Sequence, residues 1–261
     1  MTTKKEIFVF LEKAAIKRSD TVLIHTSMKS IGEVEGGCDG IIDSFCDYLK
    51  EGLFFVPTHT WENVNAETPI YNVKTTKPCI GALPTVAAFR KDGFRSLHPT
   101  HSVCAFGKNA EIFVKGEEKC ITPCPENGVW ARLYDVGAKI ILIGVGLNRN
   151  TYIHAIDEML NLKGRLSEPF SLTIIDSNGK EYKTRFRHHT ELTGSENFGN
   201  FKTPLEKFGA LTYGKLGNAN IQIFDTKLGT PIIKHLWNNA DYHLCIEEKE
   251  IPEKYYSDYK Q

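Results

Sequence analysis

His154 is followed at three and four residues by Asp157 and Glu158, and these residue types at this spacing can perform acid–base chemistry. On a helix, residues three and four positions apart lie on one face, so either carboxylate can reach the imidazole. A carboxylate partner orients a histidine and favours its protonated form, which suits it to act as a general base. The alternative from spacing alone is an ordinary histidine at a helix start, with two solvated acids.

The segment KIILIGVGLNRNTYIHAIDE contains the elements that must position His154. Residues Ile140 to Val145 form an unbroken apolar run with β-branched side chains, which predicts a strand covered on both faces. Glycines at its end allow a sharp turn, and Asn150 or Thr151 can cap the helix that follows. We therefore expect His154 in the first turn of a helix that follows a buried strand.

The segment HTSMKSIGEVEGG (25–37) follows the first predicted strand and offers a second candidate site. The hydroxyls of Ser27 and Ser30, with backbone amides near the next helix, can hold phosphate oxygens, and Lys29 can add positive charge. The segment is neither a Walker sequence nor a dinucleotide-binding fingerprint. The alternative is a strand-to-helix loop that needs glycine for its geometry.

The segment RSLHPTHSVCAFG (95–107) places Arg95, His98, His101 and Ser102 just before a predicted strand. These side chains suit a loop that binds an anion or a substrate. The alternative is a connection ordered by proline, with histidines at the surface.

The segment PTHTW (57–61) ends the second predicted strand. Thr58, His59, Thr60 and Trp61 can line a cleft at the carboxyl ends of the strands, where α/β proteins usually bind ligands. A capped strand end with a packed tryptophan is the equally weighted alternative. The long irregular stretches 59–82 and 189–203 are where we expect a substrate pocket to be built.

Histidines are numerous enough to raise the possibility of a metal site, and the candidates are His98, His101, His154, His188 and His189. The H-x-x-H pair falls on a loop, however, and no nearby acid completes a known ligand pattern. Cys120 and Cys124 are the closest cysteine pair and lack a second pair at ligand spacing. We therefore predict no metal site.

Seven irregularly spaced cysteines favour reduced thiols and a cytoplasmic location.

Alternating strands and helices in the first 145 residues predict an α/β core with largely parallel strands flanked by helices. The expected strands are 21–27, 53–58, 103–107 and 139–145, and the expected helices are 3–17, 38–50, 84–91 and 129–136. The C-terminal half adds an antiparallel hairpin with a two-residue Asn178-Gly179 turn, a strand at 221–226 and a helix at 227–239. We expect one domain over 1–261, or two tightly packed halves, with a loosely held polar tail at 248–261.

Composition excludes several classes of function. Basic and acidic residues are equal at 32 each, so no net field favours nucleic acid or an anionic membrane. No apolar run approaches the roughly 20 residues of a membrane span. The first 20 residues read as an amphipathic helix and not as a signal peptide.

Taken together, the segments resemble the aminoglycoside 3-N-acetyltransferase family of acetyl-CoA-dependent enzymes, which differ in fold from the GNAT acetyltransferases. The resemblance rests on HTSMKSIGEVEGGCDGIIDSF, FFVPTHTW, GALPTVAAFR, RSLHPTHSVCAFG, WARLYDVGAKIILIGVGLNRNTYIHAIDE and FGALTYGKLGNANIQIF, in the same order over roughly residues 5–240. It implies N-acetylation of an aminoglycoside or a related amino sugar-like acceptor, with His154 as the general base.

The resemblance also implies that two loops contribute to the CoA site. The residues concerned are Ser27, Met28, Lys29, Ser30, Ile31 and Gly32 in the first loop, and Arg95, His98 and Ser102 in the second. Acetyl transfer develops charge on the thioester carbonyl oxygen, so a donor such as the Thr58 hydroxyl should face it. A homodimer is possible, and no metal is implied.

Three features depart from the family pattern, and one is Gly128-Val129, where a Ser-Pro commonly precedes the helix before the main strand. The family favours Glu three residues after the histidine, where this chain has Asp157, with Glu158 next to it. Polycationic acceptors also suit an acidic pocket, yet the loop 59–69 offers only Glu62 and Glu67. Two alternatives stay open from sequence: a metal-dependent hydrolase that uses the histidines, and a non-catalytic relative that binds CoA or an amine.

Overall fold

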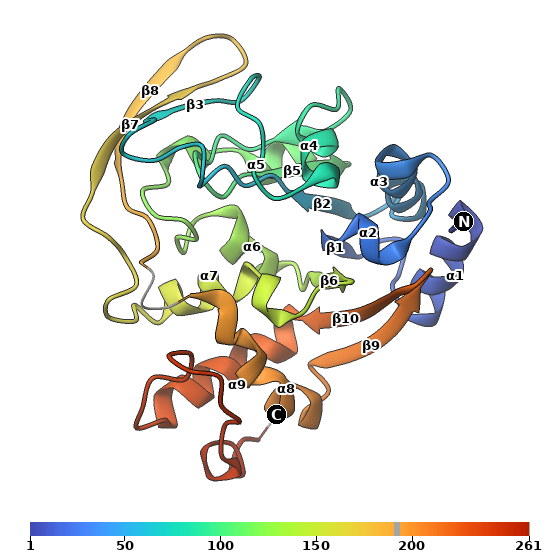
Figure 1. Cartoon of the computed structure of the whole chain (residues 1–261), viewed down its shortest axis with the longest axis vertical. Coiled ribbons are helices and arrows are strands. Elements are labelled where there is room, and N and C mark those ends of the chain that lie inside the picture. The colour runs from blue at the N-terminus through green and yellow to red at the C-terminus, as the bar shows by residue number, and fades with distance from the viewer. Residues whose placement is uncertain (191–193, 261) are drawn as a thin grey trace.

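Within residues 1–190 and 194–260, which this computed structural model describes, seven strands form a central sheet in the order β4-β5-β2-β1-β6-β10-β9 (Figure 1). Their bounds are β1 Thr21–Thr26, β2 Leu53–Pro57, β4 Phe94–Arg95, β5 Val103–Gly107, β6 Lys139–Ile143, β9 Leu211–Leu216 and β10 Ala219–Asp225. β1 pairs in parallel with both β2 and β6. Antiparallel pairs extend the sheet at both edges. The predicted α/β fold is confirmed, with its parallel part formed by the three central strands, whereas β5, predicted within the largely parallel core, runs antiparallel to β2.

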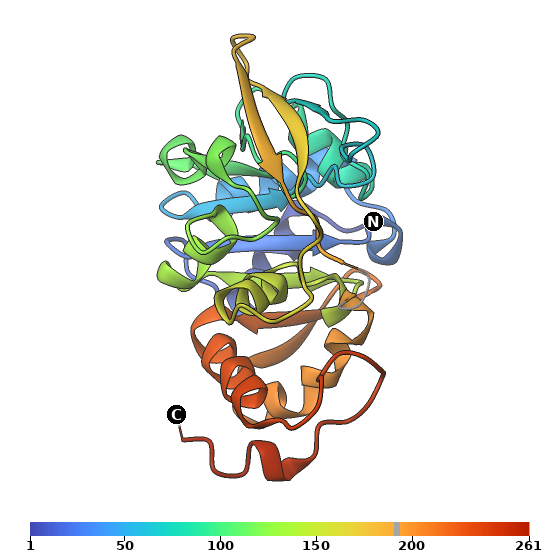
Figure 2. The same cartoon turned by 90° about the vertical axis from the view of Figure 1, so that its left-hand side faces the viewer.

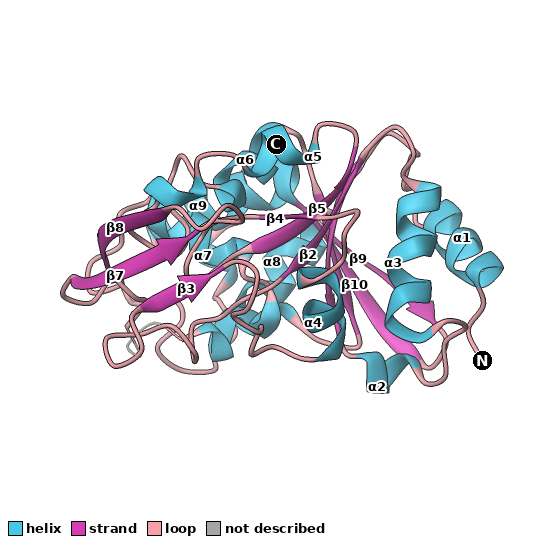
Figure 3. Ribbon diagram, turned by 90° about the horizontal axis from the view of Figure 1, so that it is seen from above, coloured by secondary structure: helices cyan, strands magenta, loops and turns pink. Residues whose placement is uncertain are grey.

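Helices cover both faces of this sheet, and Figure 3 shows α1 and α3 on one side and α6 and α9 on the other. The α-helices are α1 Lys4–Lys13, α2 Met28–Ile31, α3 Gly37–Tyr48, α4 Ala82–Ala88, α5 Ala110–Val114, α6 Val129–Asp135, α7 Tyr152–Met159, α8 Lys202–Lys207 and α9 Thr226–Asn239. Short 3-10 turns occupy η1 Glu117–Lys119, η2 Leu147–Arg149, η4 Ser195–Phe201 and η5 Glu253–Tyr255. No helix in this described part is long and apolar enough to cross a membrane.

The two faces of the sheet bury two separate apolar cores because side chains alternate along each strand. On β1, Val22 and Ile24 join the core under α1 and α3, whereas Leu23 joins the core under α6, α7 and α9. On β2, Phe54 and Phe55 divide in the same way. Burial on both faces explains why the central strands read as continuous apolar runs.

A smaller sheet in the order β3-β7-β8 stands apart from the central one, and Figure 2 shows its hairpin reaching beyond the rest of the molecule. Its strands are β3 Ile70–Asn72, β7 Phe170–Ile175 and β8 Glu181–Phe186. The predicted hairpin is confirmed, but its turn is longer than the predicted two-residue turn. Asp176 pairs with Lys180, and the Asp176 carboxylate accepts the amides of Asn178 and Lys180, so the loop spans residues 177–179.

The chain after Glu247, predicted as a loosely held polar tail, contributes to the α9 core. Ile251, Tyr255 and Tyr256 are buried there, and Asn200 accepts the amide of Lys249. The tail is polar in composition but carries apolar residues at positions that meet α8 and α9. Sequence analysis also did not predict the short strands β3 and β4 or the strand β9.

Gly144 closes the junction between β6 and the chain that leads to α7. Its φ is +67°, and an added Cβ would lie 2.3 Å from Cβ of Ser30. Glycine is therefore required here for two reasons, a left-handed backbone and a close approach of the α2 segment.

We expect Gly144→Ala to lower the free energy of unfolding by roughly 2–5 kcal/mol, because a left-handed backbone and overpacking both cost energy. Gly179→Ala is the matched control, since its φ is +83° but nothing lies within 4 Å of the added Cβ. The control should lose only about 1–2 kcal/mol. Urea unfolding of both variants measures this, and equal losses would show that the contact with Ser30 is unimportant.

Candidate active site

A cavity of about 610 Å³ opens at the carboxyl ends of the three parallel strands. This is the end of an open α/β sheet at which ligands usually bind. Its polar and aromatic lining comes from the ends of β1 and β2, from the chain after β6 and from two long loops. These residues are His25, Thr26, His59, Trp61, Glu62, Cys79, His101, Asn148, Arg149, Thr151, His154, His188, His189, Thr190, Ser195 and Glu196. Both stretches predicted to build the substrate pocket, 59–82 and 189–203, contribute to this lining; residues 191–193 lie outside the described residues.

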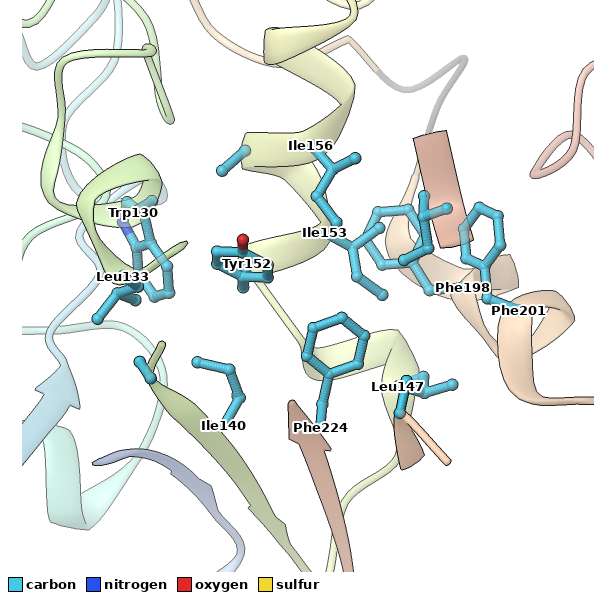
Figure 4. Close-up of a cluster of buried hydrophobic side chains, with 14 of the residues drawn as sticks. Trp130, Leu133, Ile140, Leu147, Tyr152, Ile153, Ile156, Phe198, Phe201 and Phe224 are labelled. Atoms are coloured by element: carbon cyan, nitrogen blue, oxygen red, sulfur yellow. The ribbon is translucent and has the colours of Figure 1, made fainter. Parts of the chain in front are cut away.

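Packing of α7 against the sheet fixes the position of His154. Figure 4 shows Tyr152, Ile153 and Ile156 of this helix directed into a cluster that includes Phe198 and Phe224. The Tyr152 hydroxyl is 2.6 Å from the Thr230 hydroxyl on α9. Each of these buried side chains contributes about 1.5–3 kcal/mol, so the helix is held firmly while its other face meets the cavity.

Asp157, and not Glu158, is the carboxylate beside His154. Its Oδ2 lies 4.0 Å from Nδ1 of His154, and both atoms are bonded by the guanidinium of Arg165, which is 2.8 Å from Oδ2. All three side chains are largely buried. A guanidinium can only donate, so Nδ1 is an acceptor here and a neutral His154 carries its ring proton on Nε2.

Glu158 instead holds a second imidazole, that of His189. Its Oε1 is 2.8 Å from Nε2 of His189 and 2.8 Å from the amide nitrogen of Cys124. Its Oε2 accepts from the Thr122 hydroxyl at 2.6 Å. Burial acts to raise the pKa of Glu158, but these hydrogen bonds outweigh it and lower the pKa overall. The ionised carboxylate therefore accepts from Nε2–H of His189.

Four imidazoles form a continuous row along the cavity. Ring centroids are 4.4 Å apart for His154 and His189, 5.5 Å for His189 and His101, and 4.7 Å for His101 and His59. Burial lowers the pKa of each of these histidines, and the neighbouring imidazoles add to the effect for His59, His101 and His154. The row is therefore uncharged near neutral pH, which is the state that a general base requires.

The residues Thr58, Arg95, His98 and Ser102 build the wall behind the cavity and do not line it. Ser102 Oγ donates to the Thr58 carbonyl at 2.8 Å, and Arg95 donates to the same oxygen at 3.3 Å. His98 is fully buried, and its Nδ1 accepts the amides of Thr100 and His101. These bonds fix the loop that carries His101. Direct contact of the four residues with acetyl-CoA or with the acetyl carbonyl stays a prediction.

The predicted CoA loop Ser27–Gly32 lies at the same end of the sheet, where it forms the short helix α2. Ser27 caps this helix through the amide of Ser30, and the two hydroxyls are 2.8 Å apart. None of Ser27, Met28, Lys29, Ser30, Ile31 and Gly32 lines the cavity, although Thr26 immediately before them does. Their role in holding CoA also stays a prediction.

Cys124, Glu158 and His189 place possible metal-ligand atoms within 4.8 Å of one another. The glutamate and histidine atoms are already joined by a hydrogen bond, and burial raises the pKa of the Cys124 thiol. A hydrogen-bonded pair thus accounts for this geometry without an ion. Among the described residues, His98 and His101, the H-x-x-H pair considered in the sequence analysis, belong to no such group.

Sequence reasoning missed several residues of the site, chiefly His25 and Arg165. His25 is the last residue but one of β1 and lines the cavity, and the strand-end argument that singled out residues 58–61 applies to it equally. His59 and Trp61, which that argument did name, line the cavity as predicted. Arg165 lies in an irregular segment after α7, and nothing in its sequence context marks it as a partner of His154.

Comparisons with known proteins identify the family of this chain. The family model described as aminoglycoside 3-N-acetyltransferase matches residues 23–236. The chain is 24% identical over 244 residues to the SPbeta prophage-derived aminoglycoside N(3')-acetyltransferase-like protein YokD of Bacillus subtilis (strain 168), covering 85% of this chain and 87% of that protein. It is 22% identical over 197 residues to aminoglycoside N(3)-acetyltransferase III of Salmonella sp, covering 69% of this chain and 68% of that one.

Solved structures share the fold. A binary complex of AAC-IIIb with CoASH superposes with a TM-score of 0.77 at 18% identity, covering 88% of this chain and 94% of that one. A variant of aminoglycoside acetyltransferase AAC(3)-IVa in complex with a gentamicin gives 0.76 at 21% identity, covering 91% and 89%. Because the family model spans most of its length, this chain belongs to the aminoglycoside 3-N-acetyltransferase family of acyltransferases.

Proposed function

We propose that this chain moves the acetyl group of acetyl-CoA to a primary amine of an aminoglycoside, with His154 as the general base. The observation that carries this proposal is the position of His154, uncharged and facing the cavity at the carboxyl ends of the parallel strands. Family membership supports the reaction class, and relatives crystallised with CoASH and with a gentamicin support the two substrates. Nothing in the comparisons favours a hydrolase.

The reaction needs positioning and proton removal more than covalent catalysis. An alkyl ammonium group cannot attack until it loses a proton, and a positioned histidine supplies this step. Once the amine is held against the thioester, no acyl-enzyme intermediate is required. Nε2 of His154 can accept a proton only when Nδ1 carries the other one. The nearby Asp157 carboxylate, 4.0 Å away, is the group that can accept Nδ1–H once Arg165 withdraws from that nitrogen.

Acidic and aromatic side chains at the mouth of the cavity suit a cationic sugar. Glu62 and Glu196 offer carboxylates to ammonium groups, and Trp61 offers an exposed ring face. Arg149 is the basic residue in the same lining, on the side of the cavity that follows β6. Charges of both signs in the lining of one cavity suit a cationic acceptor together with an anionic acetyl donor. A homodimer and a cytoplasmic location remain predictions.

We expect the purified chain to release CoA thiol from acetyl-CoA when gentamicin, apramycin or a simple amino sugar is added. CoA at about 100 times its dissociation constant should also stabilise the fold by about 2.7 kcal/mol. A thiol-release assay and thermal melts with calorimetry measure both effects. An unchanged melting temperature at millimolar CoA, with no heat of binding, would remove the basis for acetyl-CoA as donor.

Turnover should not depend on an added metal, because Glu158 and His189 are satisfied by hydrogen bonds. Metal analysis of the purified protein, combined with assays in the presence of EDTA, tests this expectation. If EDTA abolished turnover and zinc restored it, the hydrogen-bonded pair would have to be reinterpreted as a metal site.

We expect His154→Asn to lower kcat by roughly 10²–10⁴-fold while the fold and CoA affinity are kept, since a positioned base contributes about that much. Asp157→Asn should also lower kcat, but by less, because a neutral amide replaces the carboxylate charge that stabilises the protonated ring. Lys215→Ala, a change at the exposed end of β9, is the control. Steady-state kinetics with CoA titration measure these effects, and near-native turnover by folded His154→Asn would show that another group is the base.

A further inference from the structure

Acetyl transfer from the ammonium form of the acceptor removes two protons from one nitrogen. The N–C bond forms, the C–S bond breaks with its electron pair going to sulfur, and the ammonium nitrogen becomes an amide. One proton ends on the CoA sulfur and the other goes to solvent. A single imidazole can hold only one proton more than its neutral form, so the full reaction suits two acceptors.

The two neighbouring imidazoles in the cavity are held in opposite tautomers. Nδ1 of His154 accepts from Arg165, so in this structure Nε2 of His154 carries the ring proton and is a donor. Nε2 of His189 donates to Glu158, so Nδ1 of His189 carries the lone pair. Among the described residues, no donor is placed on that Nδ1 atom. His189 is thus the imidazole that is ready to accept a proton.

The surrounding charges also favour His189 over His154 as the first proton acceptor. A proton gained by His189 lies beside the Glu158 carboxylate, 2.8 Å from its ring, whereas a proton gained by His154 lies beside the Arg165 guanidinium. The other titratable or charged groups that act on His189 are Arg165 and the imidazoles of His59, His98, His101, His154 and His188. Burial lowers the pKa of His189, and Glu158 opposes this, so the imidazole is neutral but has a partner for its charged form.

We propose that His189, held by Glu158, accepts the first proton from the bound ammonium group at Nδ1. His154 receives the second proton at Nε2 as the amine attacks, after Arg165 withdraws and the ring proton of His154 moves to Nδ1 beside Asp157. The ring centroids are 4.4 Å apart and both imidazoles line the same cavity, so the two candidate acceptors are neighbours in it. His154 then returns its proton to the CoA sulfur, and His189 releases the net proton to solvent. This division of roles deepens the proposed function and rests on it.

The kinetic test is His189→Gln, because a glutamine amide can still donate to Glu158 but has no basic lone pair. We expect kcat/KM for an aminoglycoside amine to fall about 10²-fold at pH 7, within the usual contribution of a positioned acid or base. The loss should shrink as pH rises toward the pKa of the acceptor amine, because free amine no longer needs the first deprotonation. His154→Asn should lose activity at every pH.

His235→Gln is the matched control, since His235 lies on α9 and bonds Asp258 away from the cavity. It should leave the pH profile unchanged. A His189→Gln profile parallel to that of the wild type, or near-native turnover at pH 7, would overturn the inference. If the wild-type protein acetylates no amine, the proposed function itself is wrong. Assaying the wild type alongside the variants therefore distinguishes that failure from a failure of the role given to His189.

A second readout does not depend on turnover. Nitrogen-15 NMR of histidine-labelled protein separates protonated from lone-pair ring nitrogens, and the signals that vanish in His189→Gln assign this residue. We expect a neutral His189 at pH 7 with the proton on Nε2. A proton on Nδ1 would overturn the inference. If His189→Gln does not fold, the His189 signals can be assigned instead from those that shift in Glu158→Gln, so this readout does not depend on the first variant.

Glu158→Gln also gives a kinetic test. Removing the carboxylate should lower the pKa of His189, so activity should persist to lower pH than in the wild type; an unchanged pH dependence on the acidic side would count against the role of His189.

Discussion

The structure depends on burying imidazoles in their neutral form beside fixed partners. A buried charge without a partner is costly, so burial is the main reason that the histidines are uncharged and can accept protons. The histidines differ in the hydrogen-bond partner of each imidazole. Arg165 fixes the tautomer of His154 and Glu158 fixes that of His189. The direction in which protons can move is therefore determined by two hydrogen bonds, each made outside the cavity.

The scaffold places these bonds through ordinary packing. The three parallel strands end together, and Gly144 lets the chain leave β6 and enter α7 close to α2. The apolar face of α7 packs into the α6 and α9 core, so its polar face meets the cavity. The wall that carries His101 is set by hydrogen bonds of His98, which never reaches the cavity itself. Residues that do not line the cavity thus set the geometry of those that do.

Much of this could be predicted from sequence because it is encoded locally. The apolar run 140–145, the helix that carries His154 and the strand-end residues His59 and Trp61 are all recognised from short patterns. The edge strands β3 and β4 are too short to carry a pattern. The pairing of Glu158 with His189 joins residues 31 positions apart, so spacing along one helix wrongly allowed Glu158 to serve His154. The insertion of Arg165 beside His154 is a tertiary contact with no local signal.

The central claim is that one acceptor amine lies against both imidazoles. A crystal structure of the chain with CoA and gentamicin tests this most directly. The account predicts one amine nitrogen within hydrogen-bond reach, about 3 Å, of Nδ1 of His189 and Nε2 of His154. An acceptor bound with every amine remote from both nitrogens would contradict it.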